Sequence, residues 1–223
     1  MEISALQAVQ QRVHRAMVAA GTQVRLLAVS KRQPDSAVRD LVAQGHRTFG
    51  ENYVQALVAR REAFQPFPLE WHLIGALQSN KCRLAAMHAD WVQSIDRLDI
   101  VAQLARLRGV DRPRLNVLVE VNIDAECSKT GCAVAKLDEL CAAVAAEPRL
   151  HLRGFMAIPH AHVELEARRA SFARMRDLFD KARHDFDDFD TLSMGMSDDF
   201  ELAIAEGATM VRVGTALFGA RPE

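Results

Sequence analysis

The sequence predicts an α/β protein, a single (β/α)8 TIM-type barrel over residues 1–223 with one extra amino-terminal helix. Short apolar segments recur about eight times, most are followed by a segment with helical periodicity, and no Pro-, Gly- or Ser-rich linker divides the chain. Alternating strands and helices form parallel sheets, and eight such units over about 200 residues are typical of a closed barrel. The alternative is an open doubly wound sheet, but the Gly-rich G-x-G-x-x-G loop expected after its first strand is absent.

The extra helix is predicted over residues 2–19, where apolar residues recur at spacings of three and four until Gly21 ends the pattern. The predicted strands are apolar runs with little polar alternation, which suits strands buried on both faces of a parallel sheet. These strands cover residues 24–30, 47–50, 70–75, 91–95, 115–123, 151–157, 191–194 and 209–214. Helical patterns cover residues 35–44, 52–64, 80–88, 97–108, 134–146, 164–184 and 198–206.

Composition and charge exclude several classes of function. The net charge is −1, so no basic surface is predicted for nucleic acid. No apolar run approaches the roughly 20 residues that span a bilayer, and the first residues lack the basic region of a signal peptide. The four cysteines form no C-x-x-C pair, so we expect reduced thiols and no metal site. We therefore expect a cytoplasmic protein that binds neither nucleic acid nor membrane.

Lys31 is the first candidate site residue. It follows the apolar run from Leu26 to Val29, at the carboxyl end of the first predicted strand. Parallel α/β folds place their chemistry at these strand ends. A half-buried lysine loses hydration there, so its pKa falls and its free amine becomes nucleophilic toward aldehydes. The alternative is a surface lysine that only closes a strand.

The loops after the seventh and eighth predicted strands supply a candidate phosphate site. Gly195 allows the chain to turn, and Ser197 stands where an N-cap would open the predicted helix 198–206. Gly214 and Thr215 open a further short segment after the eighth strand. Free N–H groups and hydroxyls at helix starts bind anions, and these two loops are the usual phosphate site of such barrels. Alternatively, Ser197 only caps its helix and Gly214 only eases a turn.

A lysine and a phosphate site in one barrel mouth indicate an aldehyde that bears a phosphate, and pyridoxal 5′-phosphate has both groups. Arg212 precedes the phosphate site on the eighth predicted strand, within reach of the ring nitrogen. A guanidinium offers only donors and stays protonated, so it would hold that nitrogen unprotonated. This contact weakens the ring as an electron sink. A salt bridge in the barrel wall is the alternative role of Arg212.

Seven short blocks, spread in order from about residue 24 to residue 221, form a pattern that is specific when they are taken together. They are AVSK (28–31), FGENY (49–53), WHLIG (71–75), LQSNK (77–81), GFM (154–156), LSMGMSDD (192–199) and VRVGT (211–215). In these blocks the chain resembles the pyridoxal 5′-phosphate homeostasis protein family.

The resemblance implies a barrel related to the amino-terminal domain of alanine racemase, with pyridoxal phosphate bound as a Schiff base on Lys31. It implies cofactor contacts from Asn52, Ser197, Arg212, Gly214 and Thr215. It further implies intracellular vitamin B6 homeostasis, by storage and delivery of the cofactor, without established catalysis and with no catalytic residues. The partners would be pyridoxal phosphate and the apo-enzymes that use it, and we expect a monomer.

A racemase-type enzyme on the same barrel is the alternative function. The arginine at the ring nitrogen does not separate the two functions, because alanine racemases have it too. A racemase needs a second base, a tyrosine that the carboxyl-terminal β-domain of a partner subunit supplies opposite the lysine. The chain ends at Glu223, soon after its last predicted strand, and its one tyrosine, Tyr53, lies in the helix predicted after the second strand. We therefore expect no such base.

A phosphosugar enzyme of the barrel class is a third hypothesis. His72 and Glu51 could supply the acid–base pair that it needs. The combination of Lys31 with Arg212 argues against this hypothesis.

Two further lysines are candidates for transferring the cofactor, because a second amine can release a Schiff base by transimination. Lys129 lies in the loop 124–131 after the fifth predicted strand, on the same face as Lys31, with Gly131 as a hinge. Lys81, after the third strand, is the second candidate. The alternative for Lys129 is an ordinary solvated loop lysine.

Overall fold

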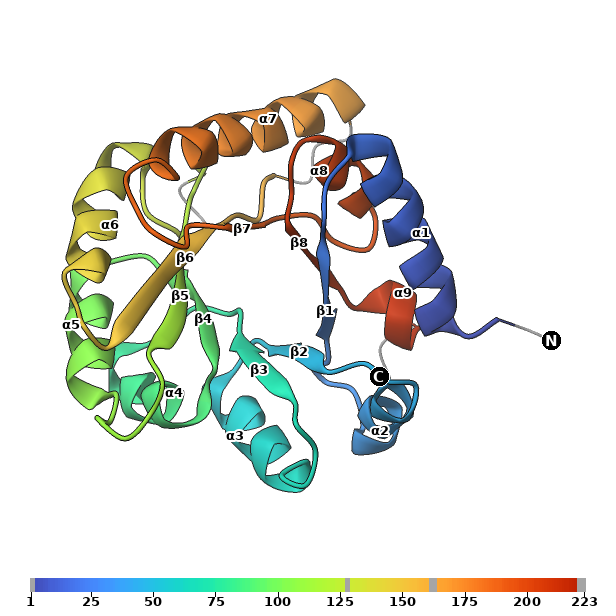
Figure 1. The fold of residues 1–223 in the computed structure, drawn as a ribbon, viewed down its shortest axis with the longest axis horizontal. Coiled ribbons are helices and arrows are strands. Elements are labelled where there is room, and N and C mark those ends of the chain that lie inside the picture. The colour runs from blue at the N-terminus through green and yellow to red at the C-terminus, as the bar shows by residue number, and fades with distance from the viewer. Residues whose placement is uncertain (1–2, 127–128, 161–163, 220–223) are drawn as a thin grey trace.

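The computed structural model describes residues 3–126, 129–160 and 164–219, and it confirms the predicted barrel (Figure 1). Eight parallel strands follow one another in sequence order, and β1 closes the barrel by pairing with β8. The strands are β1 (Arg25–Val29), β2 (Thr48–Glu51), β3 (Glu70–Leu73), β4 (Trp91–Ile95), β5 (Leu115–Glu120), β6 (Leu150–Met156), β7 (Thr191–Ser193) and β8 (Met210–Val213). The helices are α1 (Ala5–Ala20), α2 (Asp35–Ala43), α3 (Val54–Ala63), α4 (Cys82–His88), α5 (Leu98–Leu107), α6 (Leu137–Ala145), α7 (Leu165–Ala182), α8 (Phe200–Ala205) and α9 (Thr215–Phe218), with 3-10 turns η1 (Ser79–Lys81) and η2 (Val134–Lys136).

The predicted extra helix is α1, which lies on the outside of the barrel against α8 and α9 (Figure 1). Ser4 caps it, because the Ser4 hydroxyl accepts the Gln7 N–H and the Gln7 side chain accepts the Ser4 N–H. Gly21 ends the helix in the left-handed conformation with φ 65°. The inner face of α1 buries Leu6, Val9 and Val13.

The barrel interior contains polar side chains among the apolar ones. Ser193 on β7 hydrogen-bonds Gln93 on β4, and these strands are not neighbours, so the bond crosses the interior. His72 and Arg212 join the same group of buried side chains, and neither is more than 4% exposed. Buried polar groups are costly unless they are hydrogen-bonded, so this group constrains the interior more than apolar packing would.

The predicted boundaries differ from the structure mainly at strand and helix ends. The strand predicted to reach residue 123 ends at Glu120, and Val121 instead forms an isolated bridge to Cys132. The helices predicted from residues 80 and 134 each begin with a 3-10 turn. The helix predicted over 198–206 begins only at Phe200, and this difference changes the role of Ser197 described below.

Candidate functional site

The residues predicted to bind the cofactor follow strands that are neighbours in the closed barrel. Because β8 pairs with β7 and β1, and β1 pairs with β2, the ends of these four strands form one continuous part of the rim (Figure 1). Lys31 follows β1, Asn52 follows β2, Ser197 follows β7, Arg212 lies in β8, and Gly214 and Thr215 follow β8. The fold thus brings residues from both ends of the sequence to one side of the barrel mouth.

Arg212 is almost fully buried and is held by three uncharged oxygens. Its Nη1 donates to the carbonyl and the hydroxyl of Ser193, both at 2.8 Å, and its Nη2 donates to the carbonyl of Ala157 at 2.8 Å. Burial lowers the pKa of Arg212 to about 10, although the negative charges of Glu120 and Asp199 oppose that shift. The guanidinium therefore stays protonated at neutral pH. Its described contacts are hydrogen bonds to neutral oxygens, and not the barrel-wall salt bridge that was the alternative role of Arg212.

The turn that carries Lys31 is anchored to β2 through Ser30. The Ser30 N–H donates to the Gly50 carbonyl at 3.0 Å, and its hydroxyl donates to Glu51 Oε1 at 2.7 Å. Burial raises the pKa of the Glu51 carboxyl above its ordinary value, and this hydrogen bond opposes the rise. The charge of Lys31 also lowers the pKa of Glu51, so the amine and the carboxyl are electrostatically coupled.

Arg60 on α3, which was not among the predicted site residues, holds the same turn from outside. Its Nε lies 3.4 Å from Glu51 Oε1, and its two terminal nitrogens bond the Asp35 carboxylate and the Gln33 carbonyl. A signal was present, because Arg60 occupies the buried face of its helix together with Val54 and Leu57. A charged residue on an apolar helix face indicates a buried partner.

Ser197 does not cap the following helix, so that part of the prediction is wrong. The turn before α8 is closed by Asp199, whose Oδ1 accepts the Met196 N–H at 2.7 Å, and Asp199 is the N-cap residue. The Ser197 hydroxyl oxygen instead accepts the N–H of Ala216 at 3.3 Å, at the start of α9. This bond joins the loops after β7 and β8, which were predicted to bind phosphate together.

The mouth also contains a buried acceptor to which the described part of the chain supplies no donor. Asn52 Oδ1 is buried, and within the described ranges no group donates a hydrogen bond to it. The loop after β3 approaches Asn52 so closely that a Cβ at Gly75 would lie 2.2 Å from the Asn52 carbonyl oxygen. A ligand with a donor would satisfy this oxygen, because unpaired buried acceptors are costly.

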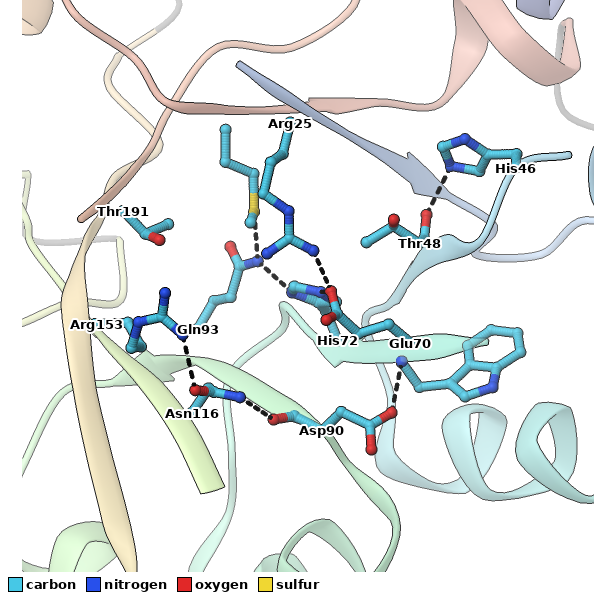
Figure 2. Close-up of polar contacts among 12 residues, drawn as sticks. Arg25, His46, Thr48, Glu70, His72, Asp90, Gln93, Asn116, Arg153 and Thr191 are labelled. Carbon is cyan, nitrogen blue, oxygen red and sulfur yellow. Dashed lines mark hydrogen bonds and ion pairs between the residues drawn. The ribbon is translucent and has the colours of Figure 1, made fainter. Parts of the chain in front are cut away.

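His72 and Glu51, the hypothesised acid–base pair, take different partners. His72 is fully buried, with Nε2 2.6 Å from a carboxyl oxygen of Glu70 and Nδ1 2.8 Å from Nε2 of Gln93 (Figure 2). Glu51 instead accepts from Ser30 at 2.7 Å. With both ring nitrogens in use, His72 is occupied by interior contacts, and the phosphosugar hypothesis gains no support.

The two candidate transfer lysines lie after β5 and β3. Lys129 Nζ lies 2.6 Å from a carboxyl oxygen of Glu126 and donates to the Ile158 carbonyl at 3.3 Å. Lys81 is the last residue of η1 and is half-buried. The Lys129 amine is therefore tied to the loops after β5 and β6, and it would have to leave them to reach a cofactor. Its transfer role stays a prediction.

Among the described helices, none is long and apolar enough to cross a membrane. Within residues 3–126, 129–160 and 164–219, no group of three or more His, Cys, Asp and Glu side chains is arranged to hold a metal ion.

Comparison with known proteins agrees with this geometry. The pattern of the alanine racemase amino-terminal domain family matches residues 4–222. A pyridoxal phosphate homeostasis protein from Pseudomonas aeruginosa is 50% identical over 213 residues, which cover 94% of this chain and 91% of the relative. The protein of that name from Escherichia coli K12 is 51% identical over 202 residues, covering 89% of this chain and 86% of the relative.

A solved structure adds a bound cofactor in a relative. PipY of Synechococcus elongatus, solved with pyridoxal phosphate bound, is 35% identical and superimposes with a TM-score of 0.83. The match covers 94% of this chain and 99% of PipY. The chain belongs to the pyridoxal phosphate homeostasis protein family, on the barrel of the alanine racemase amino-terminal domain.

Proposed function

We propose that this chain binds pyridoxal 5′-phosphate through a Schiff base on Lys31 and serves in intracellular vitamin B6 homeostasis, by storing the cofactor and delivering it to apo-enzymes. One observation carries the proposal: Lys31, Arg212 and Ser197 follow or lie in the neighbouring strands β1, β8 and β7. A primary amine, a guanidinium and a hydroxyl match the aldehyde, the ring nitrogen and the phosphate of that cofactor. The PipY structure, solved with pyridoxal phosphate bound, supports binding of this cofactor.

Lys31 would attach the cofactor covalently. Its amine adds to the aldehyde carbon, a C=N bond replaces the C=O bond, and one water molecule leaves. The turn that carries Lys31 is held on both sides, by Ser30 through Glu51 and by Arg60 through Gln33. This bracing restricts the positions of the amine before the cofactor arrives, which reduces the entropy lost on binding.

The phosphate would bind where the loops after β7 and β8 meet. Ser197 accepts one hydrogen bond from Ala216 and keeps its own hydroxyl proton for an anion. Gly214 brings this loop against β1, since a Cβ at Gly214 would lie 3.3 Å from the Val29 carbonyl oxygen. Thr215 adds a second hydroxyl at the start of α9.

Arg212 would contact the ring nitrogen. Its bonds to Ser193 and Ala157 number three, and a guanidinium has five N–H donors, so donors remain for the mouth. A protonated arginine keeps the ring nitrogen unprotonated and weakens the ring as an electron sink. Stable storage of the cofactor suits such a site better than carbanion chemistry does.

A racemase-type enzyme has less support. The relatives at about 50% identity are named as homeostasis proteins and not as enzymes. Tyr53, the one tyrosine of the chain, is 62% exposed at the start of α3 and is not held opposite Lys31 by a described contact. We therefore propose a binding protein, cytoplasmic and monomeric.

The test uses the purified protein and borohydride. The loaded protein should absorb as a Schiff base, and reduction should fix the cofactor on the peptide that contains Lys31. Lys31→Ala should still bind pyridoxal phosphate without the covalent bond, and more tightly than it binds unphosphorylated pyridoxal. A label found only on Lys81 or Lys129 would overturn the lysine assignment. Equal affinities of Lys31→Ala for the two compounds would overturn the phosphate site.

A further inference from the structure

A chain of buried hydrogen bonds crosses the barrel from Arg212 to the amino-terminal end of the strands, which we call the barrel floor. Arg212 donates to the Ser193 hydroxyl, which lies 2.8 Å from Gln93 Oε1. Gln93 Nε2 lies 2.8 Å from Nδ1 of His72, and Nε2 of His72 lies 2.6 Å from the Glu70 carboxylate. Figure 2 shows the part from Gln93 to Glu70.

The donor and acceptor roles in this chain can be worked out from the floor. Arg25 forms an ion pair with Glu70 (Figure 2). Burial alone would raise the pKa of Glu70, but hydrogen bonds from His72 and Arg25, together with the charge of Arg25 and that of His72 when its ring is protonated, lower it to about 2. The carboxylate is therefore ionised and only accepts, so the proton sits on Nε2 of His72. Burial lowers the pKa of His72, which leaves the ring neutral and Nδ1 an acceptor.

The donor and acceptor roles of Gln93 and Ser193 follow from the tautomer of His72. Gln93 must turn its Nε2 toward the unprotonated Nδ1 of His72. Nε2 of Gln93 also lies 3.2 Å from the Met210 sulfur. Oε1 of Gln93 then faces Ser193, which must donate its hydroxyl proton to it. The Ser193 oxygen is left as an acceptor for Nη1 of Arg212.

We infer that Glu70, at the barrel floor, sets the direction of every hydrogen bond in this chain, and that Gln93 and Ser193 act as positioning residues for the Arg212 guanidinium. The contact of Arg212 with the cofactor rests on the proposed function. The positioning of Arg212 depends only on this series of hydrogen bonds, whether or not the cofactor binds. Residues at the floor would thus influence the cofactor site without touching the cofactor.

The chain transmits its direction because its members from His72 through Gln93 and Ser193 to Arg212 are buried and have few alternative partners. If the His72 proton moved from Nε2 to Nδ1, it would face Nε2 of Gln93, which is also a donor. The Gln93 amide would then have to rotate and turn its oxygen toward His72. The amide nitrogen would then donate to the Ser193 oxygen, which also accepts from Arg212, and the Ser193 hydroxyl proton would lose the Gln93 oxygen as its acceptor. Unsatisfied buried donors are costly, so a change at one end must be felt at the other.

Glu70→Leu tests the direction. Without the carboxylate, Arg25 can donate to Nε2 of His72, so the proton should move to Nδ1 and the guanidinium resonances of Arg212 should shift. Nitrogen NMR of the protein without cofactor measures both, and in the unaltered protein His72 should show a bare Nδ1 and a protonated Nε2. Glu70→Asp, which keeps an acceptor-only carboxylate, should retain the original tautomer.

Asp90→Leu is the matched control. Asp90 is also a carboxylate at the floor, its side chain is 30% exposed against 34% for Glu70, and it also pairs with an arginine, Arg61. Its carboxylate accepts the Trp71 N–H and lies outside the chain (Figure 2). Losing it should lower stability while leaving the His72 tautomer and the Arg212 resonances unchanged.

The second readout is affinity. In Glu70→Leu and in Gln93→Met, the dissociation constant for pyridoxal phosphate should rise about threefold to tenfold, the range that one hydrogen bond contributes. Affinity for inorganic phosphate, which would use only the loops after β7 and β8, should not change.

Several results would overturn the inference. One is a proton on Nδ1 of His72 in the unaltered protein, which needs no variant to fold. Another is an Arg212 spectrum that is unaffected by Glu70→Leu, or equally affected by Asp90→Leu. Shifted resonances with unchanged cofactor affinity would overturn the positioning role. If the unaltered protein binds no pyridoxal phosphate, the proposed function fails, and the Arg212 resonances still decide the inference.

Discussion

Arg60 Nε lies 3.4 Å from Glu51 Oε1, and both side chains are largely buried, at 10% and 2% exposure. The pair joins α3 to the end of β2, next to the turn that carries Lys31. Glu51 also accepts the Ser30 hydroxyl, so one buried carboxylate connects the helix, the strand and the lysine turn. The position of the turn that carries Lys31 therefore depends on the buried contacts of Ser30, Glu51 and Arg60.

Arg60→Met should destabilise the protein by about 3 kcal/mol, because removing one partner leaves the other charge buried without compensation. Urea unfolding measures this loss. Arg61→Met is the control on the same helix. Arg61 pairs with Asp90 at 36% and 30% exposure, so its loss should cost at most about 1 kcal/mol. Equal losses for the two variants would contradict the structural role of Arg60.

Glu51 should make the protein less stable as pH rises. Burial raises its pKa in the folded state, so the folded protein holds this proton more tightly than the unfolded chain does. The resulting stability is fully present below the unfolded pKa and is lost as pH rises through the folded pKa. Glu51→Gln keeps an acceptor for Ser30 but cannot titrate. The difference in free energy of unfolding between the two proteins should therefore vary with pH in this window, and a constant difference would contradict the shift.

Gly75→Ala should weaken cofactor binding and lower stability by about 1–3 kcal/mol. The added Cβ would lie 2.2 Å from the Asn52 carbonyl oxygen, so the backbone at Asn52 must move. Gly45→Ala is the control. The φ of Gly45, 93°, disfavours any side chain, but a Cβ there would meet open space. It should lose about 1 kcal/mol and keep its affinity. Calorimetry with pyridoxal phosphate should separate the two variants.

Lys129→Arg should slow cofactor transfer without changing equilibrium binding at Lys31. Arginine keeps the positive charge near Glu126 but removes the nucleophilic amine. Recovery of activity by an apo-enzyme measures the transfer rate. Lys136→Arg is the control, since Lys136 pairs with Glu139 and is 69% exposed. An unchanged rate in Lys129→Arg would leave Lys81 as the remaining candidate.

The sequence by itself determined the barrel and the order of its elements. Apolar runs and helical periodicity are local signals, and eight alternations leave few topologies. The position of Lys31 at a strand end followed from the same local pattern, since the apolar run stops beside it. Helix ends were less predictable, because capping depends on tertiary contacts as much as on the capping residue.

Only the tertiary structure decided how the polar side chains pair. Ser197 could have capped its own helix, but the turn closed by Asp199 directs it to Ala216 instead. The bond from Ser193 to Gln93 joins residues 100 positions apart, and no local pattern predicts such a partner. Strand order and closure bring these side chains into one small interior, where burial makes each polar group find a partner.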